Sequence, residues 1–226
     1  MSGLTLCTNL GNQPIAFIPL HLYMPLHDDG YVKYASQWTK TALLKEDFEE
    51  LIVYRNKLAA LNLIGIYPDQ IGYGNISQRI KQTTQFIISG TQTGQHKIAL
   101  PEHFCKVTDV NIAQNKLLCE GPVQASSEAM THAAIYLADT NVNTVIHIHH
   151  HELWQQLKNI VTTTDITITY GTPEMANAMF DAVKAIEKNK LPKIIITAGH
   201  QEGVFTFGSS MKDAYETLMM FYHEHQ

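Results

Sequence analysis

The chain has 226 residues, of which 45% are hydrophobic and 16% charged, a composition that fits one large globular domain or two small ones at most. Its 21 acidic and 16 basic residues give a net charge of -5, and the basic residues are scattered along the chain. This distribution argues against binding to nucleic acid or to an anionic membrane, and favours a small-molecule or protein partner.

The first segment is the least regular. Pro14, Pro19 and Pro25 interrupt a mixture of aromatic and aliphatic residues, so residues 1–44 are predicted to form an extended N-terminal arm packed on the body. Residues 45–226 then make up the main domain.

After the arm, the pattern changes from helix to strand. Apolar residues recur at helical spacing from about residue 45 to residue 62, which predicts an amphipathic helix. Residues 76–80 and 84–89 are typical of short strands, and the small and hydroxylated residues 90–94 form a loop that suits anions.

Strands and helices alternate through the rest of the chain. Ser126 and Ser127 are predicted to cap a helix that runs to about Ala138, and a β-type run, 144–149, follows it. Periodicity, β-branching and turn residues predict the remaining segments: a helix over about 152–159, a β-branched run over 162–169, a helix from Gly171 to about Lys188, strands over 193–197 and 204–207, and a helix over about 210–223.

The run 144–149 carries His147 and His149 at alternate positions. Residues two apart on a strand lie roughly 7 Å apart on one face, so the two imidazoles can hold a single cation. Val145 shares their face, whereas Ile146 and Ile148 point to the other, and the strand is predicted to be buried on both faces. Because unpartnered buried imidazoles are costly, a metal, a carboxylate or a water network must satisfy them.

Zinc needs three or four ligands that converge from more than one element. Glu128 lies on the helix before the histidine strand, and His200 lies in a glycine-flanked turn whose small neighbours leave it room to approach a metal. Histidines completed by a carboxylate are a common catalytic zinc set, so His147, His149, His200 and Glu128 predict a site for zinc or another divalent cation. His150 and His151 are interpreted as bystanders at the end of the strand.

Three segments rich in small polar residues offer amides and hydroxyls that suit a phosphate: Gly72–Ser77, Ser89–Gly94 and Ser126–Ser127. The first is not a dinucleotide motif, because its third glycine is missing and a strand rather than a helix follows.

Neither a membrane span nor a disulfide framework is indicated. No apolar stretch approaches the roughly 20 residues that cross a bilayer, and the N-terminus lacks a basic segment followed by an apolar one. We therefore expect a cytoplasmic protein. Cys7, Cys105 and Cys119 have no paired spacing, so they are interpreted as reduced, structural thiols.

An ordered set of motifs resembles the class II aldolase and adducin family, which includes fuculose-phosphate aldolase, ribulose-phosphate 4-epimerase and methylthioribulose-phosphate dehydratase. The set comprises Gly74-Asn75-Ile76-Ser77, Ser89 to Gly94, Ser126-Ser127-Glu128, His147-Ile148-His149 and His200 before Gly203. The resemblance covers about residues 45–226, and its most specific part is the spacing from Ser-Ser-Glu to His-x-His.

The resemblance implies an α/β fold, a three-layer α/β/α sandwich with a largely antiparallel central sheet, assembled as a homo-oligomer, by likeness a tetramer with active sites at subunit contacts. It implies that His147, His149 and His200 bind zinc, and that Glu128 is an acid/base carboxylate that also caps the metal when substrate is absent. The substrate phosphate would contact Asn75, Ser89, Gly90, Thr91, Ser126 and Ser127.

The implied activity is that of an aldolase-type lyase acting on a small sugar or sugar phosphate. A zinc-stabilised enediolate would form beside the carbonyl, with Glu128 moving the proton. An epimerase, a dehydratase and a non-catalytic adducin-like assembly module stay open as alternatives.

The sequence departs from the family pattern in two places. Family aldolases carry a proton-donating tyrosine after the histidine pair, but here Tyr170 is the sole tyrosine in 150–170 and adjoins Gly171, so the role is not assigned to it. The turn after His200 also holds extra residues, of which Glu202 either reaches the metal or only solvates the turn.

Overall fold

The computed structural model describes residues 30–42, 44 and 46–225. Most of the predicted N-terminal arm, and Cys7 with it, lies outside the described residues. The described part of the arm contributes a strand, β1 (Ala35–Lys40), to the edge of the central sheet. The division into an arm, 1–44, and a domain, 45–226, stays a prediction.

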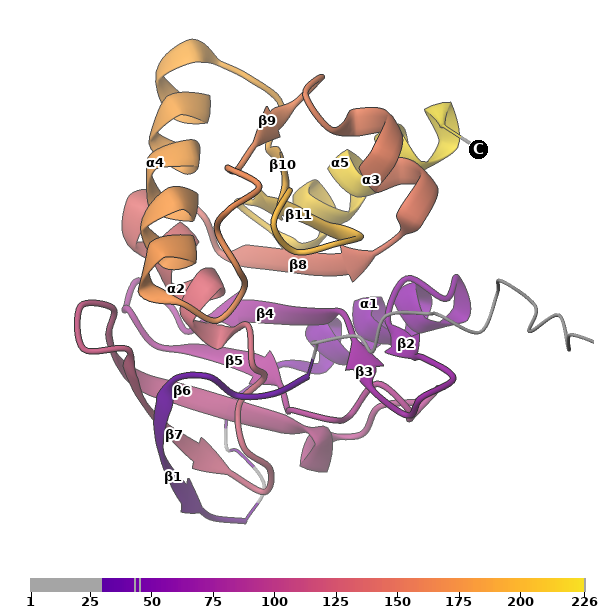
Figure 1. Ribbon diagram of the computed structural model, residues 1–226. Coiled ribbons are helices and arrows are strands. Elements are labelled where there is room, and N and C mark those ends of the chain that lie inside the picture. The colour runs from indigo at the N-terminus through magenta and orange to yellow at the C-terminus, as the bar shows by residue number, and fades with distance from the viewer. Residues whose placement is uncertain (1–29, 43, 45, 226) are drawn as a thin grey trace, which may run out of the picture.

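One sheet of nine strands organises the described part of the chain (Figure 1). Besides β1 it contains β4 (Asn75–Arg79), β5 (Phe86–Ser89), β6 (Phe104–Asn111), β7 (Lys116–Gly121), β8 (Thr144–His149), β9 (Thr162–Thr163), β10 (Ile194–Ile196) and β11 (Gly203–Gly208). A separate ribbon pairs β2 (Gly65–Ile66) with β3 (Gly72–Tyr73).

The strand order is β1-β7-β6-β5-β4-β8-β11-β10-β9. The outermost pairs, β1 with β7 and β9 with β10, are parallel, and the pairs between them are antiparallel. The predicted α/β class is confirmed, and the sheet is mixed rather than strictly antiparallel because both of its edges are closed by parallel strands.

Five α-helices accompany the sheet: α1 (Glu49–Ala60), α2 (Ala129–Ala138), α3 (His151–Leu157), α4 (Pro173–Asn189) and α5 (Met211–Glu224). Each of the expected helices is present within a few residues of its predicted limits. Three begin at side-chain caps, because Thr172 Oγ1 accepts from the Met175 N–H at 3.2 Å, Ser210 Oγ from the Asp213 N–H at 3.1 Å and His150 Nδ1 from the Leu153 N–H at 3.2 Å.

Two apolar clusters lie on opposite faces of the sheet. One packs α2 and α4 against the face that carries Val145, and the other packs α1, α3 and α5 against the face that carries Ile146 and Ile148. Successive residues of β8 alternate between the clusters, as the period of a strand requires. The predicted burial of β8 on both faces is confirmed, since all six of its residues are buried.

Two expectations about local structure need correction. The β-branched run 162–169 forms a strand only at Thr162–Thr163, because Asp165 Oδ1 accepts from the Thr167 N–H and hydroxyl at 2.8 and 2.7 Å, a local turn that ends the pairing. The predicted caps Ser126 and Ser127 precede the true start of α2, which has Glu128 at its N-cap position.

None of the helices in the described ranges combines the length and apolarity that crossing a bilayer needs. Cys105 and Cys119 are free and buried.

Candidate metal centre

β8 brings two histidines to the middle of the sheet. His147 pairs in register with Asn75 of β4 on one side and Phe205 of β11 on the other, and His149 lies opposite Gly203. Their side chains share the face of Val145, as predicted, and both are buried. The Phe205 ring stacks on His147 with 4.0 Å between centroids, which restricts the rotation of that imidazole.

His200 reaches the same place from the turn between β10 and β11. The Thr197 hydroxyl holds the turn through the carbonyls of His200 and Gly203, at 3.3 and 3.1 Å. Gly199 is required by close packing, because a Cβ there would lie 2.0 Å from the Ile168 carbonyl oxygen. Gly199 therefore lets the 164–170 loop approach the turn. Gly203 leaves room for His200 as expected, because a Cβ there would lie 3.2 Å from His200 Nδ1.

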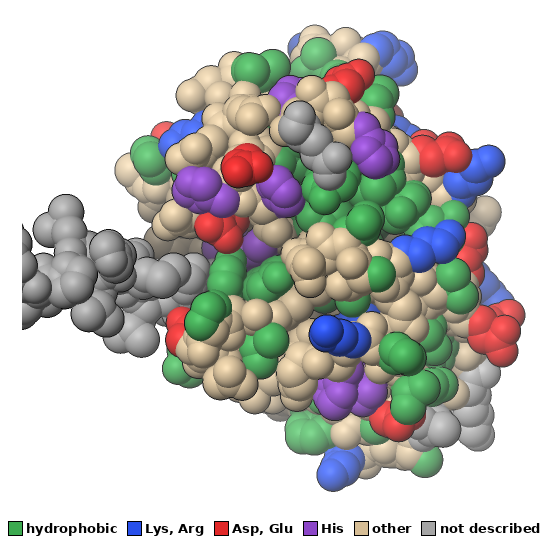
Figure 2. Space-filling view, turned by 90° about the vertical axis from the view of Figure 1, so that its right-hand side faces the viewer, with side chains coloured by type: hydrophobic (Ala, Val, Ile, Leu, Met, Phe, Trp, Pro, Cys, Tyr) green, Lys and Arg blue, Asp and Glu red, His purple; other side chains and the backbone are tan. Residues whose placement is uncertain are grey.

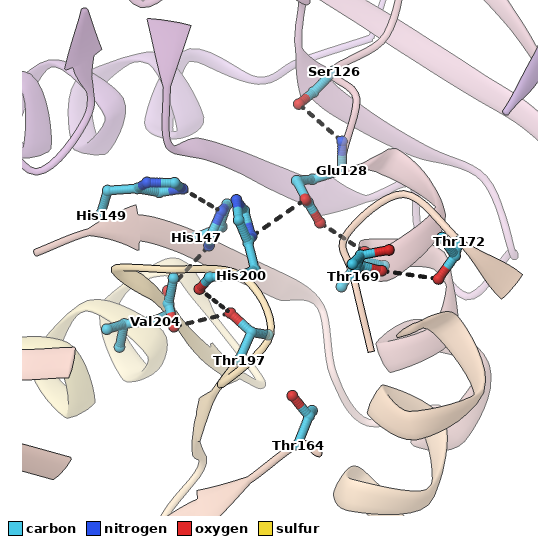
Figure 3. A network of polar contacts seen from close by, with 12 residues as sticks. Ser126, Glu128, His147, His149, Thr164, Thr169, Thr172, Thr197, His200 and Val204 are labelled. Atoms are coloured by element: carbon cyan, nitrogen blue, oxygen red, sulfur yellow. Dashed lines mark hydrogen bonds and ion pairs between the residues drawn. The ribbon is translucent and has the colours of Figure 1, made fainter. Parts of the chain in front are cut away.

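The three histidines form a compact donor set (Figure 3). One ligand nitrogen from each of His147, His149 and His200 lies within 4.8 Å of the others, and no further group of this kind occurs among the described residues. The Nε2 atoms of His147 and His149 are 3.1 Å apart. Two nitrogens bound tetrahedrally to zinc at 2.0–2.1 Å would be separated by about 3.3 Å, so this spacing fits a shared cation.

The protonation of His147 also suits a ligand. Burial lowers the pKa of His147 well below its usual range, and His200 lowers it further. Its Nδ1 contacts the Val204 carbonyl oxygen at 3.3 Å. Since a carbonyl only accepts, Nδ1 carries the hydrogen and Nε2 presents its lone pair to the centre.

Glu128 lies beside the histidines at the start of α2. Its Oε1 is 3.6 Å from His200 Nδ1, and its Oε2 accepts a hydrogen bond of 2.7 Å from the Thr131 hydroxyl. Ser126 Oγ accepts from the Glu128 N–H at 3.3 Å, which fixes the turn ahead of the helix. The structure thus brings the predicted carboxylate to His200, outside the compact set of three nitrogens.

A pocket opens over this cluster. It is lined by nearly all the predicted site residues, namely Asn75, Gly90, Thr91, Ser126, Ser127, Glu128, His147, His149 and His200. Ser89 is not on its wall, because the Ser89 hydroxyl instead accepts from the Ile76 N–H at 3.2 Å.

The polar groups on the pocket wall differ in availability. The N–H groups of Gly90 and Thr91 already donate to the carbonyls of His103 and Gln124, at 2.8 and 2.9 Å. In contrast, the buried Oδ1 of Asn75 has no hydrogen-bond partner among the described residues. Asn75 therefore offers an unused acceptor on this wall.

Sequence reasoning assigned no role to Tyr170, which is one of the aromatic neighbours of the site. Tyr170 is buried, lines the pocket and stacks on His200 with 4.8 Å between ring centroids. Lys33 Nζ lies 3.7 Å from the centroid of the same ring. In the sequence, the position of Tyr170 next to Gly171 argued against a proton-donor role. In the structure, Gly171 has a φ of +71° and forms a turn into α4, and this turn places Tyr170 at the site.

Comparison with known families agrees with the fold. The family model described as Class II Aldolase and Adducin N-terminal domain matches residues 69–223. This chain therefore belongs to the class II aldolase and adducin family, as the motifs indicated. A search of curated proteins finds no match.

Solved structures with the same fold include an L-fuculose 1-phosphate aldolase, which is 15% identical with a TM-score of 0.59, covering 80% of this chain and 86% of that one. YgbL of Klebsiella pneumoniae is 15% identical with a TM-score of 0.58, covering 77% and 84%. A sugar-phosphate aldolase from Thermotoga maritima is 16% identical with a TM-score of 0.53, covering 77% and 89%.

Proposed function

We propose that this protein is a zinc-dependent aldolase-type lyase that acts on a small sugar or sugar phosphate. The observation that carries the proposal is the convergence of three buried imidazoles, from β8 and from the β10–β11 turn, next to the carboxylate of Glu128. Membership of the class II aldolase family and the fold shared with an L-fuculose 1-phosphate aldolase support the same chemistry.

The residues divide the work in the proposed mechanism. His147, His149 and His200 would hold the divalent cation, which supplies the positive charge that stabilises an enediolate. Glu128 moves the proton at the carbon beside the carbonyl, and the Thr131 hydroxyl keeps Glu128 Oε2 in place while Oε1 faces the centre.

The opposite wall would hold the far end of the substrate. The residues proposed for this role are Asn75, Gly90, Thr91, Ser126 and Ser127, with the unused Asn75 oxygen accepting from a substrate hydroxyl. Ser89 would support this wall from behind, through its hydrogen bond with the Ile76 N–H. No Lys or Arg lines the pocket among the described residues. Substrate tests must therefore pair each sugar phosphate with its unphosphorylated form.

The first test is metal content. Purified full-length protein should contain close to one zinc per chain, and His147→Ala with His149→Ala should abolish binding, because each removes a donor nitrogen. Elemental analysis after dialysis against metal-free buffer measures this. A folded, metal-free wild-type chain that takes up no added zinc would remove the enzyme proposal and favour an adducin-like assembly module.

The second test is turnover. Zinc-loaded protein is incubated with ketose and aldose phosphates and, in parallel, with the unphosphorylated sugars. Cleavage, epimer and dehydrated products are followed separately by mass spectrometry and NMR. We expect an aldehyde and a ketone fragment; only epimer, or only dehydrated product, would replace the aldolase with another reaction of the family.

Glu128→Gln should lower turnover about 10²- to 10⁴-fold while zinc content stays unchanged, because the amide cannot accept the proton. Glu174→Gln is the matched control, an exposed acid in the first turn of α4. Full activity in Glu128→Gln would rule out the proton-transfer role.

The family likeness also supports a three-layer α/β/α arrangement and a cytoplasmic homotetramer. Light scattering coupled to gel filtration should give four times the chain mass of 25.4 kDa. A measured mass of one chain would contradict the proposed tetramer, and the result of the metal test would still stand.

A further inference from the structure

Glu202 lies in the turn that supplies His200, and its carboxylate contacts a tyrosine. Glu202 Oε2 accepts a hydrogen bond of 2.8 Å from the Tyr67 hydroxyl, whose oxygen is also 2.8 Å from His149 Nδ1. The three groups form a chain that runs from the protein surface to the candidate metal ligand. Figure 2 shows histidine and acidic side chains gathered on this face of the molecule.

The direction of these hydrogen bonds follows from the groups themselves. A phenol has one hydrogen, and the Glu202 carboxylate can only accept, so the Tyr67 hydrogen points to Glu202. The Tyr67 oxygen then accepts from His149, which places the imidazole hydrogen on Nδ1. Nε2 of His149 is left with its lone pair, 3.1 Å from Nε2 of His147.

His147 arrives at the same state through the Val204 carbonyl, so two nitrogen lone pairs face each other. Such a pair is repulsive unless a cation lies between them. The hydrogen bonds that link Glu202, Tyr67 and His149 therefore favour a bound cation over a direct hydrogen bond between the two histidines.

Backbone geometry supports a dedicated role for Glu202. Its φ is +67°, a left-handed conformation that is strained for a non-glycine residue. The carbonyl of Glu202 accepts from the His150 N–H at 3.0 Å, and Oε1 lies 3.3 Å from His151 Nδ1. Both contacts hold the carboxylate against the end of β8.

Tyr67 is equally constrained. It lies in the tight turn between β2 and β3, where its N–H donates to the Ile71 carbonyl at 2.8 Å and its carbonyl accepts from the Gln70 N–H at 2.9 Å. Its ring packs on Tyr73 with 4.5 Å between centroids. The hydroxyl is therefore fixed at its place between Glu202 and His149.

We propose that Tyr67 and Glu202 are positioning residues that hold His149 in the tautomer and orientation required for metal binding. The inference rests on the proposed metal site and adds residues to it that do not themselves touch the cation. Partners of this kind behind a metal-binding histidine typically change metal affinity by 10- to 100-fold.

The test measures zinc affinity of the full chain by competition with a chromophoric chelator. Tyr67→Phe and Glu202→Gly should each weaken zinc binding 10- to 100-fold. Glycine suits the left-handed backbone at 202, so that variant should fold at least as stably as the wild type. The double variant should bind about as weakly as the weaker single variant, because both act through one histidine.

Two matched controls accompany these variants. Tyr73→Phe removes the hydroxyl of the other tyrosine packed near His149, which donates to the Asn62 carbonyl at 3.1 Å instead. Glu152→Gln neutralises an exposed acid that lines the same surface pocket as Tyr67 and Glu202. Both should bind zinc within about twofold of the wild type.

A spectroscopic readout separates positioning from general stability. With Co²⁺ in place of zinc, the visible absorption bands should shift in Tyr67→Phe and Glu202→Gly and stay unchanged in both controls. If wild type binds zinc and both test variants match it in affinity and cobalt spectrum, the positioning role is wrong and the proposed function stands. If wild type binds neither ion, the metal site and this inference fail together.

Discussion

At the scale of single residues, a few short hydrogen bonds stabilise polar side chains that are buried inside this protein. His132 is fully buried in α2, and its Nδ1 lies 2.7 Å from the Ser77 hydroxyl, which also contacts the Tyr136 hydroxyl at 2.7 Å. Burial lowers the pKa of His132 to about 3. This imidazole is therefore neutral in the folded protein over the ordinary pH range.

His132 should make stability depend on pH. Below pH 6.5 the unfolded chain protonates this histidine while the folded chain does not until about pH 3, so stability falls as pH decreases through that window. At pH 4.5 the wild type should have lost about 2 to 3 kcal/mol more unfolding free energy than His132→Gln. Urea unfolding at pH 6.5, 5.5 and 4.5 measures the difference.

The control for this prediction is His223→Gln, which changes an exposed histidine of α5. It should follow the pH dependence of the wild type. Identical slopes for the wild type and His132→Gln would show that His132 titrates alike in both states.

At the scale of elements, the loop 164–172 and the start of α4 act together. The loop carries Tyr170 onto His200, and the Thr172 hydroxyl both donates to the Thr169 carbonyl at 2.8 Å and accepts from the Met175 N–H. The cap therefore anchors the end of the loop that packs on the site.

Thr172→Ala should lower the unfolding free energy by about 1 kcal/mol, because it leaves the first turn of α4 without its acceptor. Thr172→Ser keeps the hydroxyl and should retain most of that stability. Urea denaturation of the three proteins at one pH tests this, and equal midpoints for the alanine and serine variants would contradict it.

Element prediction succeeded where the signal was local. Turn residues and helical periodicity predicted α4 and α5, whereas the hairpin of β6 and β7 was not predicted. The pairing of β6 with β7 has a register shift between Val107 and Asp109, and β6 also pairs with β5 on its other side. β1, which lies in the predicted arm, was not predicted as a strand either, because only its pairing with β7 makes it one.

At the scale of the whole molecule, the candidate ligands tie together separate parts of the sheet. His147 and His149 lie on β8, and His200 lies beyond β10, with β11 between the two strands. A cation bound only by the folded arrangement stabilises it by mass action, about 2.7 kcal/mol at a free concentration 100 times its Kd.

Removal of the metal should therefore lower Tm by roughly 5 to 10 °C for a chain of this size. Calorimetry of zinc-loaded protein with and without a chelator measures the shift. The His147→Ala, His149→Ala double variant should show none, and an unchanged Tm in the wild type would argue against a structural contribution from the ion.

The sequence by itself determined what depends on local periodicity: a strand buried on both faces, with two imidazoles on one side, and a family motif around it. The tertiary structure decided the surroundings of those imidazoles. Tyr67 and Glu202 are 135 residues apart yet share a hydrogen bond behind His149, and Tyr170 folds back onto His200. Such contacts depend on how strands and loops pack, because no short-range pattern encodes which distant side chains will meet.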